Sequence, residues 1–172
     1  METILNHSAL STHEVDLTIP ALRETLGCFP TGVAVATTLA TDGTPTGLTI
    51  NSFSSVSMDP PLILWSLANT APSFDAFMTH GAFTINILDS DQDQLCCQFS
   101  KPSLDKFSGV KWHAGHKGTP VLDDVLVTLE CDTYHTVEGG DHEVFLGQVK
   151  RMGRREAQPL VFYRGQLVTL AS

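Results

Sequence analysis

Short apolar runs that end at turn signals recur along most of this chain, and they constrain its fold more than any other feature. Residues 33–39 form a β-prone run, Asp42-Gly43 is a hairpin signal, and residues 46–53 then alternate polar with apolar side chains. Comparable apolar runs follow at residues 62–67 and 82–88. The pattern predicts short strands joined by tight turns.

The strand signal resumes in the last third of the chain. Residues 126–134 and 143–149 flank a turn at residues 138–141, and two short runs, 159–163 and 166–170, follow them. Short turns between so many strands are typical of antiparallel sheets. We therefore expect a mainly β fold, a six-stranded antiparallel β-barrel with a few short helices.

The helices are expected between these strands. One begins at Pro20, carries Leu22, Leu26 and Phe29 at helical spacing, and is closed by Pro30. Two more are predicted, from Pro72 to a stop at Gly81 and from about Asp89 to Phe99. The first has a short amphipathic stripe, and we expect a lid-type helix of about ten residues.

Composition limits the partners and the location. Among 172 residues, 10 Lys+Arg stand against 19 Asp+Glu, and this net charge of -9 disfavours nucleic acid and anionic membrane surfaces. No run approaches the ~18 apolar residues of a membrane helix, and residues 1–20 lack the regions of a signal peptide. We expect a cytoplasmic protein with an N-terminal arm, 1–18, and one domain, 19–172.

The densest group of hydrogen-bonding side chains lies where the chain has no cation. Between Arg23 and Lys101 there is no Lys or Arg, so an anion bound there would be held by neutral donors. Hydroxyl and amide side chains gather within this span at Thr46, Thr49, Asn51, Ser52, Ser54, Ser55 and Ser57. They could line a phosphate and a polyhydroxyl chain, or some could simply face water from a strand.

Other positions allow either a ligand or an ordinary structural role. Gly32 lies at a helix-to-strand turn, where backbone N–H groups can approach a ligand or merely complete the turn. Asn86 interrupts an apolar strand, and its amide must find partners in a loop or a ligand. His142 lies at a hairpin tip, where a histidine can be a surface residue or reach a pocket.

Metal and cysteine chemistry are not expected. His113 and His116 have no nearby third ligand at metal spacing. Cys96 and Cys97 are neighbours in a predicted helix and face different directions, which favours packing over redox chemistry. The chain also lacks the short motifs of serine hydrolases, P-loop proteins and dinucleotide-binding folds.

Read in order, these motifs resemble those of the short flavin reductases of the split-barrel flavin-binding superfamily, the reductase components of two-component flavin-dependent monooxygenases. The resemblance covers about residues 20–170 and is carried by Phe29-Pro30-Thr31-Gly32-Val33, residues 47–57, Asp59-Pro60-Pro61, residues 83–88, Asp105-Lys106-Phe107, Gly140-Asp141-His142 and residues 159–165. It implies a Greek-key split β-barrel that forms a homodimer, with flavin near the subunit interface.

The activity implied by the resemblance is that of an NAD(P)H:flavin oxidoreductase. A hydride would pass from NADH or NADPH to FMN or FAD, and reduced flavin would reach a partner monooxygenase. A non-catalytic flavin-binding electron carrier or sensor of the same fold is the alternative. A relative of pyridoxamine-phosphate oxidases would need more arginines near the pocket to hold its phosphate-bearing substrate.

The resemblance also assigns site residues by position. The flavin-binding set is Thr31, Gly32, Val33, Thr49, Asn51, Ser52, Ser54, Ser55, Phe83, Asn86, Ile87, Phe99 and Lys101. Within it, Phe83, Asn86 and Ile87 would border the isoalloxazine, and Phe99 and Lys101 would lie near the phosphate or the adenosine of FAD. His142 would orient the nicotinamide, and Tyr163 and Arg164 would form the wall of the NAD(P)H site.

Overall fold

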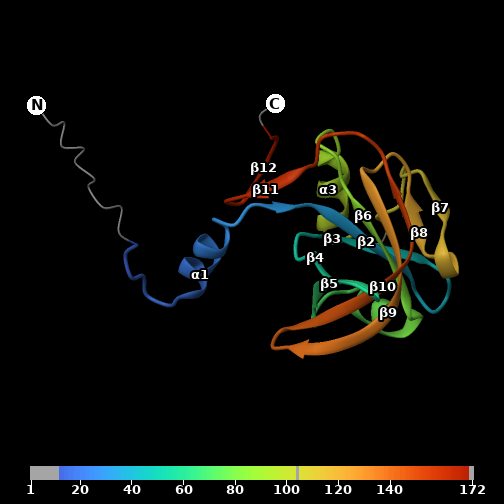
Figure 1. The fold of residues 1–172 in the computed structure, drawn as a ribbon, viewed down its shortest axis with the longest axis horizontal. Helices are drawn as coiled ribbons and strands as arrows, with labels where there is room; N and C mark the ends of the chain where they lie inside the picture. Colours follow the sequence, from blue (N-terminus) through green and yellow to red (C-terminus); the bar gives the residue numbers. More distant parts are fainter. Residues whose placement is uncertain (1–11, 104, 171–172) are drawn as a thin grey trace, which may run out of the picture.

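The computed structural model describes residues 12–103 and 105–170 and shows a mainly β protein (Figure 1). The strands are β1 (Thr31–Gly32), β2 (Ala34–Leu39), β3 (Pro45–Ile50), β4 (Ser54–Met58), β5 (Pro61–Ala68), β6 (Ala82–Ile87), β7 (Trp112–Ala114), β8 (Pro120–Leu122), β9 (Val127–Gly139), β10 (His142–Arg154), β11 (Val161–Tyr163) and β12 (Gln166–Val168). The helices are α1 (Ile19–Leu26), α2 (Phe74–His80) and α3 (Asp93–Ser100), with a 3-10 turn, η1 (His116–Gly118).

The main sheet has seven strands in the order β3-β2-β6-β9-β10-β5-β4. All of its recorded pairings are antiparallel, so the predicted mainly β, antiparallel fold is confirmed. The count of six strands is not, because Ser54–Met58 turns back along β5 as a separate edge strand. Its serines alternate with Val56 and Met58, a weak strand signal beside the apolar run of β5.

One serine hydroxyl joins the segment after β3 to the opposite part of the sheet. The Ser52 hydroxyl accepts a hydrogen bond from the backbone N–H of Ser66 at 3.0 Å and donates to the Ser66 carbonyl at 3.2 Å. Ser66 lies in β5, which is far from β3 in the strand order. The contact therefore helps to bring the two ends of the curled sheet together.

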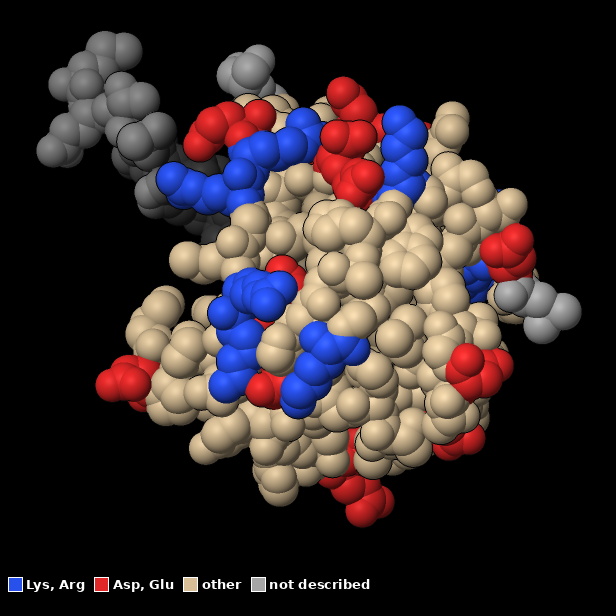
Figure 2. Space-filling model, turned by 90° about the vertical axis from the view of Figure 1, so that its right-hand side faces the viewer, with Lys and Arg blue, Asp and Glu red and all other residues tan. Residues whose placement is uncertain are grey.

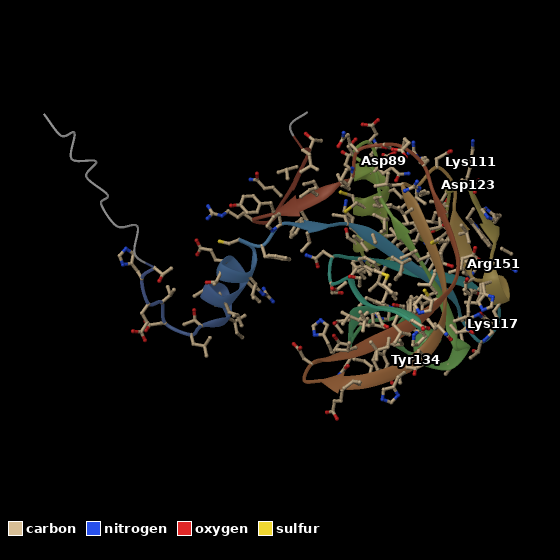
Figure 3. All side chains as sticks on the ribbon, in the orientation of Figure 1. Asp89, Lys111, Lys117, Asp123, Tyr134 and Arg151 are labelled. Carbon is tan, nitrogen blue, oxygen red and sulfur yellow. The ribbon has the colours of Figure 1, made fainter. Side chains whose placement is uncertain are left out.

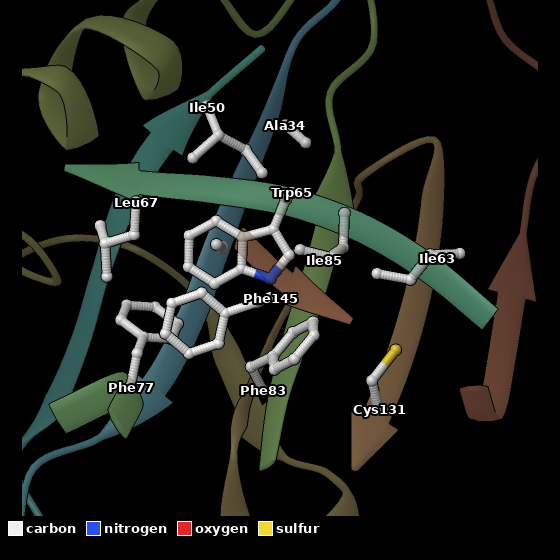
Figure 4. Close-up of a cluster of buried hydrophobic side chains, with 11 residues drawn as sticks. Ala34, Ile50, Ile63, Trp65, Leu67, Phe77, Phe83, Ile85, Cys131 and Phe145 are labelled. Atoms are coloured by element: carbon white, nitrogen blue, oxygen red, sulfur yellow. The ribbon is translucent and has the colours of Figure 1, made fainter. Parts of the chain in front are cut away.

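Alternate residues of β2 separate two buried clusters. Ala34 and Ala36 face the first, which we call the barrel core: Ile50, Ile63, Trp65, Leu67, Phe77, Phe83, Ile85, Cys131 and Phe145 (Figure 4). The Trp65 ring stacks on Phe145, with centroids 4.9 Å apart, and meets Phe77 and Phe83 edge-on. This arrangement of aromatic rings is favourable beyond the area it buries.

The second cluster lies on the other side of β2, beneath α3. We call it the outer cluster: Val33, Val35, Leu88, Cys96, Phe99, Leu122, Val125 and Leu160, with half-buried Phe107, Phe162 and Leu167 packed against it. The side-chain alternation of a strand produces this division, because successive residues of β2 point to opposite faces of the sheet. The same strand thus supports two different environments.

The later helices begin and end close to their predicted limits. α2 is followed by Gly81 at φ 74°, a left-handed conformation that glycine adopts without strain. α3 begins later than predicted because Asp89 forms a turn, in which its carboxylate accepts from Asp91 N at 2.9 Å. No helix in the described ranges is long and apolar enough to span a membrane.

α1 differs from its expected role. Thr18 caps it through a 3.3 Å hydrogen bond from Ala21 N, and Pro20 lies in its first turn, as the sequence predicts. However, α1 buries none of its residues, and Leu22, Leu26 and the following Phe29 are exposed. In Figure 1, α1 lies beside the barrel rather than on it. Residues 12–18 of the expected arm form no helix or strand, and residues 1–11 lie outside the described part.

Candidate functional site

A cavity of about 950 Å³ lies between β3 and α3, within the size range of small-molecule pockets. One wall runs along Thr44–Asn51, which contains the whole of β3. Other parts come from α3, from the segment after it, and from β11 and β12: Cys96, Cys97, Phe99, Ser100, Pro102, Ser103, Lys106, Phe107, Phe162 and Leu167. Val33 and Ala71–Ser73 complete the lining.

Gly47 allows α3 to approach this wall. A Cβ at this position would lie 2.9 Å from the Ala36 carbonyl oxygen and 3.1 Å from the Phe99 ring. The Thr49 hydroxyl fixes the same contact, because it donates to the Cys96 carbonyl at 2.7 Å. The absence of a side chain at Gly47 and the hydroxyl at Thr49 together place α3 beside β3.

The described lining residues include a single charged side chain, that of Lys106. Its ammonium donates to the Phe99 carbonyl at 2.8 Å, near the C-terminal end of α3. Partial burial lowers the pKa of Lys106. The resemblance includes the Asp105-Lys106-Phe107 motif but implies Lys101 at the phosphate end of the flavin. Lys101 is exposed and does not line the cavity, although its neighbours Ser100 and Pro102 do.

Four of the predicted flavin-binding residues meet at this cavity: Val33, Thr49, Asn51 and Phe99. Asn51 is exposed at the end of the β3 wall, while Phe99 is fully buried. Because the Thr49 hydroxyl donates to Cys96, a ligand could use only its acceptor lone pair. The cavity therefore offers apolar walls with a few neutral polar groups.

Several other predicted residues lie outside the lining. Thr31 and Gly32 form β1 and pair with Phe162 and Val161 of β11. Ser52 is bonded to Ser66, as described above. Ser54 and Ser55 are exposed on the edge strand β4, and Ile87 packs against the barrel core.

Phe83 and Asn86 are buried in the sheet rather than directed at the cavity. Phe83 belongs to the barrel core, with 1% of its surface exposed. The Asn86 amide donates to the Val35 carbonyl at 3.0 Å and to the Thr37 hydroxyl at 3.1 Å, and it accepts from Leu122 N at 2.9 Å. The Asn86 amide therefore finds its partners inside the protein, in the strands β2 and β8.

His142 begins β10 at the tip of the β9–β10 hairpin, beside the end of β5. Its Nδ1 lies 2.6 Å from Asp141 Oδ1, and this contact holds the pKa of the Asp141 carboxyl below its usual value. Asn69 donates from its amide to the Gly140 carbonyl at 3.2 Å, which ties the hairpin tip to β5. The imidazole is partly exposed and does not line the cavity.

Tyr163 and Arg164 lie at the turn between β11 and β12, and both are exposed. The Arg164 guanidinium lies 5.4 Å from the centre of the Tyr163 ring and donates to Cys28 Sγ at 3.5 Å. The Arg164 backbone N–H donates to the Gly27 carbonyl at 2.9 Å. These contacts tie the end of α1 to the β11–β12 turn and raise the pKa of Arg164, chiefly through the Cys28 hydrogen bond.

Residues 26–171 match the family model described as the flavin reductase like domain. The chain belongs to this family. The reductase component of flavin-dependent trigonelline monooxygenase from Acinetobacter baylyi is 40% identical over 153 residues, which cover 89% of this chain and 49% of that protein. The FMN reductase (NADH) SmoA from Agrobacterium fabrum is 39% identical over 145 residues, which cover 84% of this chain and 82% of that protein.

A solved flavin reductase has the same fold. The NADH:FAD oxidoreductase SgcE6 of Streptomyces globisporus, in complex with NAD and FAD fragments, superposes with a TM-score of 0.87 at 33% identity. The match covers 93% of this chain and 98% of that chain. The fold is therefore the split barrel of the flavin reductases. The chain spans about half the length of the first curated relatives it matches.

The lining fits a flavin by its chemistry. Leu48, Phe99, Phe107 and Phe162 offer apolar surface to a flat ring system. Thr44, Thr46, Ser73, Ser100 and Ser103 offer hydroxyl groups to a ribityl chain, and Lys106 offers a positive charge to a phosphate. Apart from Phe99, these residues are not in the flavin-binding set that the resemblance assigns, and the segment after α3 in particular carries few regular signals.

Proposed function

We propose that this protein is an NAD(P)H:flavin oxidoreductase that passes reduced FMN or FAD to a partner monooxygenase in the cytoplasm. The observation that carries the proposal is the cavity between β3 and α3, in a chain that matches the flavin reductase family over residues 26–171. Relatives named as reductase components of two-component monooxygenases support the function. The names of the relatives differ in the flavin, since one is an FMN reductase (NADH) and another an NADH:FAD oxidoreductase.

A bound flavin would supply the hydride acceptor, and the protein would supply binding and orientation. Phe99, Phe107 and Phe162 would exclude water from the ring system, which strengthens polar contacts nearby. Asn51, at the exposed end of the β3 wall, can donate and accept at the edge of a ring. No residue needs to form a covalent bond for this reaction.

His142 would orient the nicotinamide. Asp141 holds the imidazole through Nδ1, so the other ring nitrogen is available to a ligand. Tyr163 and Arg164 would contact the same nucleotide, from a turn that the end of α1 ties down. None of the three lines the cavity of a single chain, so this assignment rests on the resemblance of the motifs and not on proximity.

A homodimer is part of the proposal. Ile19, Leu22, Leu26 and Phe29 expose apolar surface around α1, and Val56 and Met58 do so on the edge strand β4. Such surface is costly to leave in water, and a second copy of the chain would cover it. Light scattering of the purified protein should give twice the mass of one chain, and a monomer would contradict the dimer alone.

The test of the function is consumption of NADH and NADPH under air, with added FMN, with added FAD and without added flavin. We expect turnover that depends on added flavin. The His142→Ala variant should raise the KM for the nicotinamide nucleotide while its flavin affinity changes little. Flavin that co-purifies with a protein unable to oxidise either nucleotide would replace this proposal by the non-catalytic carrier.

A further inference from the structure

His142 lies at the tip of a hairpin that extends from the barrel. The loop between β9 and β10 consists of Gly140 and Asp141, and Gly140 has a φ of 74°, a conformation in which most side chains would be strained. In Figure 1 the tip points towards the side of the molecule on which α1 lies. The Asp141 side chain is 94% exposed. Because exposed loop tips move unless their backbone groups are held, the place of His142 depends on what holds this loop.

Asn69 binds both carbonyl groups of this loop. Its side-chain amide donates to the Gly140 carbonyl at 3.2 Å, and its backbone N–H donates to the Asp141 carbonyl at 3.0 Å. Asn69 directly follows β5, whose last residue, Ala68, pairs with His142. One residue of a neighbouring strand end therefore holds the two peptide groups that precede His142.

The loop in turn orients the imidazole. Asp141 Oδ1 lies 2.6 Å from His142 Nδ1, so the direction of the ring depends on where the loop places the Asp141 carboxylate. A displacement of the loop by about 1 Å would lengthen this contact beyond the range of a hydrogen bond. The hydrogen bonds of Asn69 thus act on the His142 ring through the loop and Asp141.

The exposure of Asn69 separates positioning from stability. Asn69 and Gly140 are both exposed, and water competes for hydrogen-bonding groups at a surface, so the amide bond between them adds little to the free energy of unfolding. Orientation is more sensitive, because a small misplacement of a group that positions a substrate weakens its action strongly. A side-chain substitution leaves the backbone bond to Asp141 possible and tests the amide donor alone.

We propose that Asn69 is a positioning residue for the nicotinamide nucleotide, which acts on His142 through the Gly140-Asp141 loop. The inference rests on the proposed function, and in particular on the role of His142. Asn69 belongs to none of the motifs that carry the resemblance, and it does not line the cavity between β3 and α3. Its substitution should therefore affect the nucleotide and not the flavin.

The experiment follows oxidation of NADH and of NADPH with added flavin by Asn69→Ala. The KM for the nucleotide should rise about threefold to fivefold, while kcat and the flavin dissociation constant stay within about twofold of wild type. Asn69→Gln keeps the amide donor and should have a KM nearer to that of wild type. Thr79→Ala is the matched control, because it removes an exposed side-chain bond to a backbone carbonyl, that of Asp75 at 2.7 Å, outside the cavity lining and the hairpin.

A double-mutant cycle tests whether Asn69 acts through His142. In the His142→Ala background, Asn69→Ala should add nothing to the KM, because the group that Asn69 positions is already absent. A further rise of the same size in that background would overturn the inference. So would an unchanged KM in the single variant, an equal loss of flavin affinity, or an Asn69→Gln variant as impaired as Asn69→Ala.

The outcomes distinguish the inference from the function. If wild type oxidises neither nucleotide, the proposed function fails together with the inference. If His142→Ala has the KM of wild type, the role of His142 and the inference fail while the reductase stands. Urea unfolding of Asn69→Ala and Thr79→Ala should give similar midpoints, and a midpoint of Asn69→Ala far below that of the control would assign the amide to stability and overturn positioning.

Discussion

The barrel core and the outer cluster share β2 but differ in what surrounds them. The barrel core is enclosed by the curled sheet and α2, and its large rings pack against one another. The outer cluster lies beneath α3, and its members Val33, Phe99 and Phe107 also line the cavity. Burial alone therefore does not distinguish a residue that only packs from one that also lines a ligand cavity. Ile50 is the barrel-core member that reaches the cavity wall, whereas several members of the outer cluster face the cavity.

The largest expected effect concerns Trp65 of the barrel core. Trp65→Ala would remove stacking on Phe145 and leave a cavity, so the free energy of unfolding should fall by about 3–5 kcal/mol. Urea unfolding measures this change. Phe162→Ala, from the half-buried edge of the outer cluster, should cost about 2 kcal/mol or less but weaken FMN binding severalfold. If the Trp65 variant remains folded but loses more FMN affinity than the Phe162 variant, the proposed difference between the barrel core and the outer cluster is wrong.

Asn86, which is hydrogen-bonded to Val35 and Leu122 of the outer cluster, gives the next effect. Asn86→Ala would remove its hydrogen bonds to Val35, Thr37 and Leu122, and the buried groups left unpaired should cost about 2–3 kcal/mol. FMN affinity of the folded variant should stay within twofold of wild type. Thr38→Val, which removes one buried bond to the Ala82 carbonyl, is a smaller control. A selective loss of FMN binding in Asn86→Ala would return this residue to the site, as the sequence implied.

Asn86 also shows what a sequence can and cannot predict. Its position in an apolar strand indicates a buried amide, but the partners of that amide come from β2 and β8, which are distant in the sequence. Strand alternation, turn residues and the stop at Gly81 are local, and these were predicted correctly. Contacts between distant segments depend on how the sheet curls, which no local pattern specifies.

The candidate site follows the same rule. The resemblance assigned Thr49 and Asn51 to the flavin site, and both side chains line the cavity. Ser54 and Ser55 belong to the same motif but lie on β4, because the chain reverses after Phe53. Lys106 was missed as a cavity residue since the segment after α3 has no regular period, so its direction could not be read from spacing. α1 was recognised as amphipathic, and its apolar side chains Leu22 and Leu26 are exposed in the single chain.

A charged network gives a smaller effect away from both clusters. Asp132 lies 2.7 Å from Lys117 and 2.8 Å from His116. Lys117 lies on the side of the barrel away from α1 (Figure 3), and basic and acidic side chains lie close together on that face (Figure 2). The hydrogen bond from Lys117 is the main cause that lowers the pKa of Asp132 from 3.8 to about 2. Since this pKa is depressed in the folded state, the stabilisation is present above pH ~4 and is lost as the pH falls towards 2.

Asp132→Asn should therefore lower the free energy of unfolding at pH 7 by about 1 kcal/mol, a value reduced by partial solvation of the network. The difference from wild type should shrink as the pH falls below 4, and FMN binding should be unchanged at pH 7. Urea unfolding at a series of pH values measures it. Asp123→Asn removes a more exposed pair with His113 and should change stability less. An effect of Asp132→Asn that persists at pH 2 would contradict the linkage to its ionisation.

The smallest effect is a difference in thiol reactivity between the barrel core and the cavity lining. Cys131 belongs to the barrel core, and burial raises its pKa to about 12, so it should resist iodoacetamide in the native state. Cys97 is exposed and lines the cavity, so it should react, and added FMN should slow its labelling severalfold. Cys28 is exposed outside the cavity and provides the control, since FMN should not protect it. Mass spectrometry of labelled peptides follows each thiol separately.

Two outcomes would contradict this prediction. Equal protection of Cys28 and Cys97 would mean that FMN acts on the whole molecule, and protection of neither would place the ligand away from the α3 wall of the cavity.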